Sequence, residues 1–175
     1  VVEMRACAAT VNALVNDEIS LHIRFCAEAG IDEATLFSAT EETANLAYTR
    51  YVLDAGHSGD FLDLMAALAP CVLGYGEIGA RLLAEGHDAA YADWIETYGG
   101  EDYQQVCRDV GTLIDDAVLR RLGDQPTKSP RWAGLCQRFA TATRLEAGFS
   151  FCHIFTNVVF PVPHLLFIPS TKPDV

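Results

Sequence analysis

Apolar side chains recur every three or four positions along most of this chain, and no segment alternates between apolar and polar residues as a strand does. This spacing predicts an all-α fold. Half of the 175 residues are hydrophobic, which is enough for one domain with a core of its own. The expected helices cover residues 3–29, 41–55, 61–85, 91–98, 101–122 and 130–150.

Helix boundaries are expected at residues that favour helix ends. The expected N-terminal caps include Thr40, either Ser58 or Asp60, and Ser129 followed by Pro130. The expected stops are Gly30, Gly56, Gly86 and the pair Gly99-Gly100. Polar residues 123–128 predict a loop before the last helix.

The apolar run 61–85 contains a cysteine directly after a proline, Pro70-Cys71. Proline removes the hydrogen bond to the carbonyl of Ala66, so we expect a kink that opens space beside the thiol. Tyr75 lies four positions further on, on the same helical face as Cys71. Cys71 is therefore a candidate nucleophile, and the alternative is an inert cysteine buried in the core.

Glu146 lies within the apolar stripe of the last expected helix, between Thr143 and Phe149. A buried, ionised carboxylate without a partner costs several kcal/mol, so this group should be paired, hydrogen-bonded or protonated. Burial raises a carboxyl pKa, which suits a general acid or base. The alternatives are a buried structural ion pair and a position on the exposed edge of the helix.

Several tyrosines lie on stripes that are expected to face the core, namely Tyr48, Tyr51, Tyr75, Tyr91 and Tyr98, together with Trp94. A buried tyrosine needs a hydrogen-bond partner for its hydroxyl. If these rings converge, they form a flat pocket lined by hydroxyl groups, which suits a planar heteroaromatic ring. The alternative is that they only fill the core.

Two features bear on metal ions and redox state. The six cysteines are scattered, with no Cys-x-x-Cys pair and no cluster with histidine, so we expect reduced thiols in an intracellular protein and no metal site. Glu18 and His22 lie four residues apart, and we interpret them as a structural pair. His22 is also the one candidate haem ligand on a core stripe, and a haem protein is not the favoured interpretation.

The net charge and the composition of the C-terminal segment argue against nucleic-acid-binding and membrane proteins. Acidic residues outnumber basic ones by 24 to 12, for a formal net charge of -12, which argues against nucleic-acid and membrane-surface partners. Residues 151–171 carry no acidic or basic side chain. Their prolines argue against a continuous membrane-spanning helix. We therefore expect a helical domain at 1–150 and an irregular proline-rich tail at 151–175.

Four motifs resemble the TenA (thiaminase II) family, whose fold is the haem-oxygenase-like helical bundle. They are Ala47-Tyr48-Thr49-Arg50-Tyr51, the segment from Ala69-Pro70-Cys71 through Tyr75 to Gly79, the segment from Tyr91 to Tyr98, and Phe139 to Glu146 with Phe149. Their order and spacing agree over residues 10–149, and Glu18 with His22 resembles a further family pattern. The resemblance implies an all-α, haem-oxygenase-like bundle.

The resemblance also implies an activity. Family members are cytoplasmic, usually homotetrameric enzymes that need no cofactor and convert aminomethylpyrimidine to hydroxymethylpyrimidine, and some cleave thiamin. Cys71 resembles the family nucleophile, and Glu146 resembles the carboxylate that binds the pyrimidine and moves protons. Tyr48, Tyr75 and Tyr98 resemble the tyrosines of the substrate pocket. The expected partners are a pyrimidine or thiamin and further copies of the chain.

Two departures from the family keep an alternative open. The family normally begins with further helices that carry a substrate-binding aspartate, and no residue of this chain matches it. The family also usually has a tryptophan after its equivalent of Phe149, where this chain has Ser150. The alternative interpretation is a non-catalytic, pyrimidine-binding or regulatory helical protein.

Overall fold

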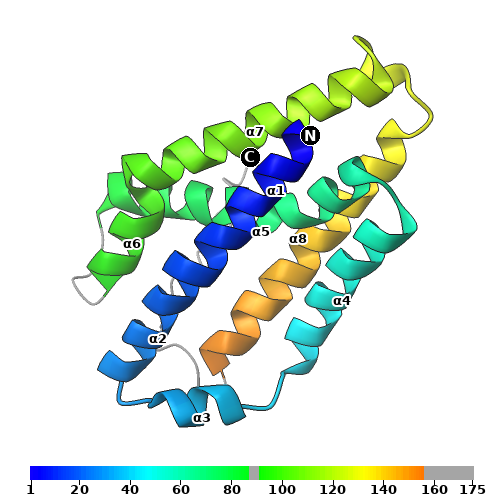
Figure 1. Cartoon of the computed structure of the whole chain (residues 1–175). Coiled ribbons are helices and arrows are strands. Elements are labelled where there is room, and N and C mark those ends of the chain that lie inside the picture. Colours follow the sequence, from blue (N-terminus) through cyan, green and yellow to red (C-terminus); the bar gives the residue numbers. More distant parts are fainter. Residues whose placement is uncertain (87–90, 156–175) are drawn as a thin grey trace, which may run out of the picture. The chain divides into compact units, whose positions relative to one another are not determined.

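The structure is a computed structural model of the 175-residue chain and describes residues 1–86 and 91–155 (Figure 1). These described residues form helices and contain no strand, so the predicted all-α fold class is confirmed. The described residues divide into two compact units, one that includes residues 1–42 and one formed by residues 43–149.

The helices of the described chain are α1 (Val2–Ala13), the π-helical turn η1 (Leu14–Glu18), α2 (Ile19–Glu28), α3 (Glu33–Ser38), α4 (Thr43–Ser58), α5 (Phe61–Glu85), α6 (Ala92–Gly99), α7 (Glu101–Leu122), the 3-10 turn η3 (Pro126–Lys128) and α8 (Trp132–Phe155). The long apolar helices were thus predicted, and the differences lie mainly at their ends.

In the first unit, the helix predicted at 3–29 is present as α1, η1 and α2 in direct succession. The predicted contact between Glu18 and His22 is confirmed, with the Nε2 and Oε1 atoms 3.6 Å apart. Helix α3 was not predicted. Its six residues are too few to show a helical period, and it begins where the Asp32 side chain accepts a hydrogen bond from the Thr35 N–H, at 2.7 Å.

The boundary between α4 and α5 corrects two predictions and confirms one. Helix α4 begins at Thr43, so Thr40 does not cap it, and it continues past Gly56 to Ser58. Asp60 caps α5 as predicted: its carboxylate accepts from the Leu62 N–H, and its own N–H donates to Asp63. This reciprocal capping box fixes the start of α5.

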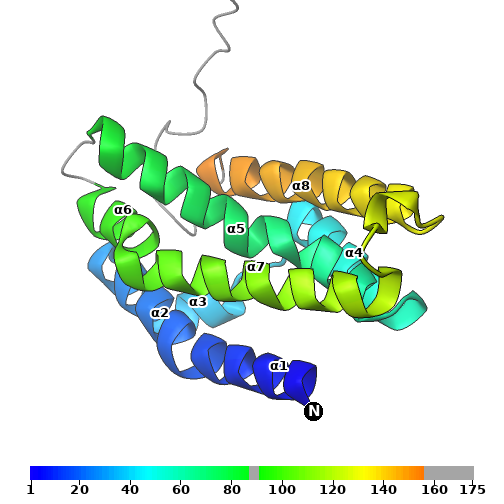
Figure 2. The same cartoon turned by 90° about the horizontal axis from the view of Figure 1, so that it is seen from above.

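Helix α5 is the central helix of the second unit, where it packs against α4, α6 and α7 (Figures 1 and 2). One buried cluster joins α4, α5 and α8 through Tyr48, Ala55, Ala67 and Ala142. Another joins α5, α7 and α8 through Leu62, Ala117 and Leu135. The buried residues of this helix are mostly small and lie on several sides of its axis.

Helix α5 also continues through Pro70 as one helix. By length and composition it is apolar enough to cross a membrane. In the structure it packs against α4, α6 and α7.

Helix α8 starts at Trp132, two residues after Pro130, and its backbone runs to Phe155. It therefore passes the predicted boundary at residue 150 by five residues. The rest of the predicted tail, 156–175, lies outside the described residues, as do the side chains of Phe149 and Ser150.

Two glycines let α5 and α6 approach each other at backbone distance. A Cβ atom built on Gly79 would lie 2.5 Å from the Gly99 nitrogen and 2.6 Å from the Tyr98 carbonyl carbon. Conversely, a Cβ atom on Gly99 would lie 2.6 Å from the Gly79 oxygen. No residue larger than glycine fits at either position without moving α6.

We expect Gly79→Ala to lower the free energy of unfolding by about 2–3 kcal/mol, because its methyl group overlaps the backbone of α6. Gly74→Ala in the same helix is the matched control, since nothing lies within 4 Å of a Cβ atom there. It should stabilise the protein by about 0.5–1 kcal/mol, because alanine favours the helix. Urea unfolding measures both values, and a neutral Gly79→Ala would contradict the close approach.

Candidate active site

The structure brings the five predicted site residues together within the second unit. Tyr48 comes from α4, Cys71 and Tyr75 from α5, Tyr98 from α6 and Glu146 from α8. Tyr48 interacts with both Cys71 and Glu146, and Tyr75 interacts with Glu146. The Tyr75 ring packs against the Tyr98 ring, with their centroids 5.2 Å apart.

Glu146 is the buried acid of this group. Its side chain is 7% exposed, and both carboxylate oxygens are shielded from solvent. Burial raises its pKa to about 7, and the nearby hydroxyls of Tyr48 and Tyr75 offset part of that rise. Among the described residues, no donor lies at the distance and angle of a regular hydrogen bond to either carboxylate oxygen. The carboxyl group is thus held near its titration point at neutral pH.

Tyr48 connects the acid to the cysteine. Its ring is buried in the cluster with Ala67 and Ala142, and its hydroxyl donates to the Ala67 carbonyl at 3.3 Å. Burial raises the pKa of this hydroxyl well above its usual value, and the neighbouring Cys71 and Glu146 raise it further. Tyr48 therefore remains a neutral phenol that can donate one proton and accept another.

Cys71 is half-buried and packs at the edge of the same cluster. It lies one helical turn after Ala67, so the phenol of Tyr48 meets the cysteine where Pro70 interrupts the hydrogen-bond pattern of α5. A thiol in this position lies beside the phenol and remains partly open to a ligand.

An aromatic wall adjoins these groups, and we define it as Tyr75, Trp94, Tyr98 and Tyr103. The Trp94 ring lies 6.0 Å from that of Tyr75 and 4.8 Å from that of Tyr98. Tyr103 meets Tyr98 edge-on at 4.9 Å. Tilted and edge-on ring pairs of this kind stabilise the packing of the wall.

Some residues that the sequence singled out lie elsewhere. Tyr51 donates to the Arg138 carbonyl at 3.5 Å, and the Arg138 guanidinium lies over its ring. Tyr91 precedes α6 as its N-terminal cap residue. Glu18 and His22 belong to the first unit. Gln104, which contacts the backbone of Tyr98, was missed, because a polar residue in an amphipathic helix has no distinctive spacing.

No group of three or more histidine, cysteine or acidic side chains that could hold a metal ion occurs in the part of the chain that the structure describes. The candidate site instead combines a carboxyl group, phenols and a thiol. Such a set can exchange protons and form a covalent bond to an electrophilic carbon.

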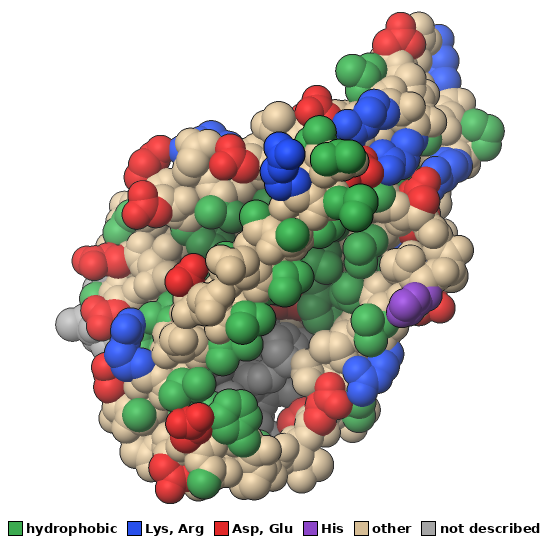
Figure 3. All heavy atoms as spheres, in the orientation of Figure 1, with side chains coloured by type: hydrophobic (Ala, Val, Ile, Leu, Met, Phe, Trp, Pro, Cys, Tyr) green, Lys and Arg blue, Asp and Glu red, His purple; other side chains and the backbone are tan. Residues whose placement is uncertain are grey.

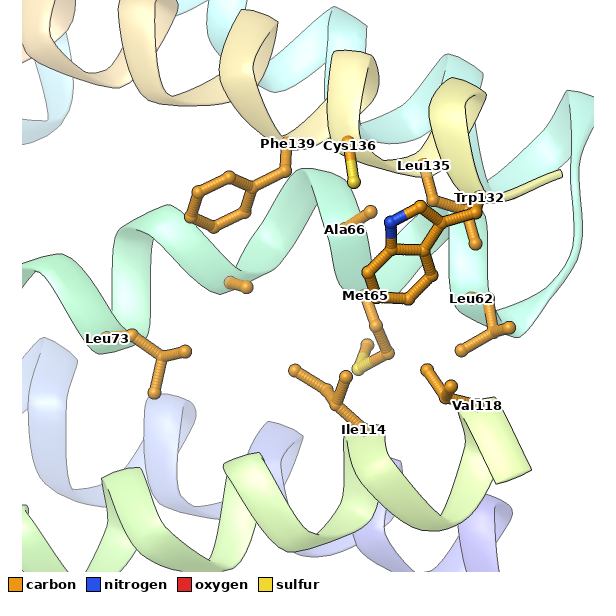
Figure 4. Close-up of a pocket in the computed structure, with 11 residues that line it drawn as sticks. Leu62, Met65, Ala66, Leu73, Ile114, Val118, Trp132, Leu135, Cys136 and Phe139 are labelled. Carbon is orange, nitrogen blue, oxygen red and sulfur yellow. The ribbon is translucent and has the colours of Figure 1, made fainter. Parts of the chain in front are cut away.

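A separate apolar pocket of about 300 Å³ lies between α5, α7 and α8 (Figure 4). Its lining includes Leu62, Met65 and Leu73 from α5, with Trp132 and Phe139 from α8. None of the five predicted site residues lines it. The register of α5 explains this, because the α5 residues of the pocket lie on the opposite side of the helix from Cys71 and Tyr75.

The protein is thus an all-α bundle in which a buried acid (Glu146), a phenol (Tyr48) and a thiol (Cys71) form a candidate site for acid and nucleophilic catalysis. The model of the TENA/THI-4/PQQC family matches residues 1–148, and the chain belongs to that family. The predicted resemblance to TenA is therefore confirmed.

The fold is similar to the crystal structure of a TenA family transcription regulator from Silicibacter sp. TM1040. The two sequences are 59% identical, and the match covers 87% of this chain and 68% of the Silicibacter chain. The TM-score of 0.85 confirms the predicted helical bundle.

Two curated relatives are named aminopyrimidine aminohydrolases. The Bacillus subtilis protein is 34% identical over 75% of this chain and 54% of its own length. The Halalkalibacterium halodurans protein is 30% identical over 79% of this chain and 61% of its own. The chain thus spans between half and two thirds of the length of these relatives.

Proposed function

We propose that this protein is a hydrolase of thiamin salvage that converts aminomethylpyrimidine to hydroxymethylpyrimidine. The observation that carries the proposal is the contact of Tyr48 with both Glu146, whose pKa burial raises to about 7, and Cys71. The names of the B. subtilis and H. halodurans relatives support the same activity.

In the proposed reaction, the thiolate sulfur of Cys71 adds to an electron-poor carbon of the pyrimidine ring, and Glu146 gives its proton to a ring nitrogen. The amino group takes the proton from the ring nitrogen and leaves the side-chain carbon as ammonia. Water adds to that carbon, the carbon–sulfur bond breaks, and Glu146 regains a proton. The sum is substrate plus water giving hydroxymethylpyrimidine plus ammonia, so no cofactor is required.

Tyr48, Tyr75 and Tyr98 line the substrate pocket in this proposal. The aromatic wall offers flat faces for the pyrimidine ring. The phenol of Tyr48 transfers a proton between the thiol of Cys71 and the carboxyl group of Glu146. In the proposed reaction the Tyr48 O–H turns from the Ala67 carbonyl toward the acid or the sulfur, and its oxygen accepts the incoming proton.

We expect Tyr48→Phe to lower kcat about 10- to 100-fold, because it removes the hydroxyl that contacts the acid and the nucleophile. The ring is retained, so the variant should lose only about 1 kcal/mol of stability with its hydrogen bond to Ala67. Tyr51→Phe is the control, since that hydroxyl bonds to α8 away from the site. Equal kinetics for the two variants would contradict the role of Tyr48.

Ammonia release from aminomethylpyrimidine tests the proposed function directly. Turnover is the expected result, and thiamin in a parallel assay shows whether the protein also cleaves the vitamin. Binding of hydroxymethylpyrimidine without any turnover would instead support a non-catalytic, pyrimidine-binding protein.

The Silicibacter relative is titled a transcription regulator, so DNA binding is a second candidate. The net negative charge of the protein argues against DNA binding. Acidic side chains are spread over the face shown in Figure 3, and the chain has a net charge of -12. Arg131 and Arg138 are engaged with Asp60 and Asp63 at 2.7–3.2 Å. DNA that shifts in a binding assay at physiological salt would overturn this argument.

Localisation and assembly follow as part of the proposal. A hydrolase of thiamin salvage with reduced cysteines works in the cytoplasm. We propose a homotetramer, and light scattering of the purified protein measures the mass that tests it.

A further inference from the structure

The first turn of α7 is joined to α5 and α6 by hydrogen bonds from side chains to backbone carbonyls. The Gln104 amide nitrogen donates to the Gly76 carbonyl at 2.9 Å and to the Tyr98 carbonyl at 3.0 Å. Both hydrogens of this amide are thus used. The Tyr103 hydroxyl donates to the Val72 carbonyl at 3.2 Å. Three helices meet at this point.

The two carbonyls that Gln104 holds lie beside the aromatic wall. Gly76 follows Tyr75 in α5, and Tyr98 is the penultimate residue of α6. Carbonyls in the last turn of a helix lack a partner within that helix. Gln104 therefore supplies a hydrogen bond that α6 cannot provide for itself, and it fixes the end of α6 that carries Tyr98.

The glycine at position 76 lets α7 approach α5 closely beside Gln104. A Cβ atom there would overlap the Cys107 sulfur and would lie 3.4 Å from the Gln104 amide nitrogen. Helix α7 therefore packs closely against α5 at this position, and the Gln104 side chain is half-buried between the helices.

We propose that Gln104 is a positioning residue for ligand binding, which sets the separation and tilt of the Tyr75 and Tyr98 rings through the carbonyls of Gly76 and Tyr98. Gln104 touches no reacting atom, since it acts through the aromatic wall. The class of ligand, a planar heteroaromatic ring, rests on the proposed function, whereas the effect on the wall does not.

The test compares Gln104→Met with Gln105→Met in the full chain. Methionine keeps the length of glutamine but donates no hydrogen bond. Gln105 is the matched control, because it is the next residue of α7, is exposed and bonds only to Arg108 and Asp109 among the described contacts. Near-UV circular dichroism reports the packing of the wall without any ligand, and its aromatic signal should weaken in Gln104→Met alone.

Kinetics separate positioning from a general loss of structure. Gln104→Met should raise KM for aminomethylpyrimidine about tenfold with kcat within twofold, because stacking on the wall contributes equally to the ground and transition states. A purely structural role would lower the active fraction and hence kcat, with KM unchanged. Either that pattern or an unchanged KM would overturn the proposal.

Failure of the proposed function can be recognised separately. If the wild type releases no ammonia, the dissociation constant of hydroxymethylpyrimidine, followed by tryptophan fluorescence, replaces KM and should rise by the same factor. If the wild type also binds no pyrimidine, the dichroism of the two variants decides, and an unchanged aromatic signal in Gln104→Met overturns the positioning role.

Discussion

Cys71→Ser should lower ammonia release from aminomethylpyrimidine by at least about 10³-fold while the protein stays folded. A serine hydroxyl has nearly the shape of the thiol, but at neutral pH it supplies almost no anion to attack the ring. Cys71 is half-buried, so the exchange of sulfur for oxygen should change the free energy of unfolding by only about 1 kcal/mol.

The control for this experiment is Cys136→Ser. Cys136 is exposed and lines the separate apolar pocket on the opposite side of α5. Its replacement should leave turnover unchanged. Ammonia release, urea unfolding and binding of hydroxymethylpyrimidine are measured on both variants, and full turnover by Cys71→Ser would refute the nucleophile assignment.

The main features of this site could be predicted from the sequence because its polar members interrupt apolar patterns. Glu146 occupies an apolar stripe, and such a group must be buried with partners or lie at an edge. The structure finds it 7% exposed. The tyrosines could be placed on core-facing positions for the same reason, although their convergence depends on how four helices are arranged, which periodicity does not determine.

The packing of α5 and the role of Gln104 leave no recognisable pattern in the sequence. Most of the buried residues of α5 are small, including Ala67, Gly76 and Gly79, and small residues give only a weak apolar signal. Gln104 works by donating to backbone carbonyls of two other helices, and any residue can supply such an acceptor. These contacts are set by the close approach of α5, α6 and α7, so only the structure reveals them.

Glu146 carries the second large prediction, which concerns stability as a function of pH. Burial raises its pKa from 4.5 to about 7 in the folded protein. Between these values the folded state binds more protons than the unfolded state, so this group makes the free energy of unfolding fall as the pH rises. The loss begins above the unfolded pKa and is complete above the folded one. It amounts to about 3 kcal/mol.

Glu146→Gln should therefore stabilise the protein at pH 8.5 by up to about 3 kcal/mol and have little effect at pH 4, because the amide never ionises. The same change removes the proton donor, so turnover should fall about 10²- to 10⁴-fold. Urea unfolding at the two pH values measures the first effect and ammonia release the second.

The matched control is Glu77→Gln in α5, where the side chain is exposed. It should leave both the pH dependence and the turnover unchanged. If Glu146→Gln gave the same stability difference at both pH values, the buried acid would be ionised or neutral throughout, and its proposed role as a proton donor would lose its physical basis. A gain in stability at high pH together with lost turnover would mean that the fold tolerates an unfavourable buried carboxyl group at the position where the reaction uses its proton.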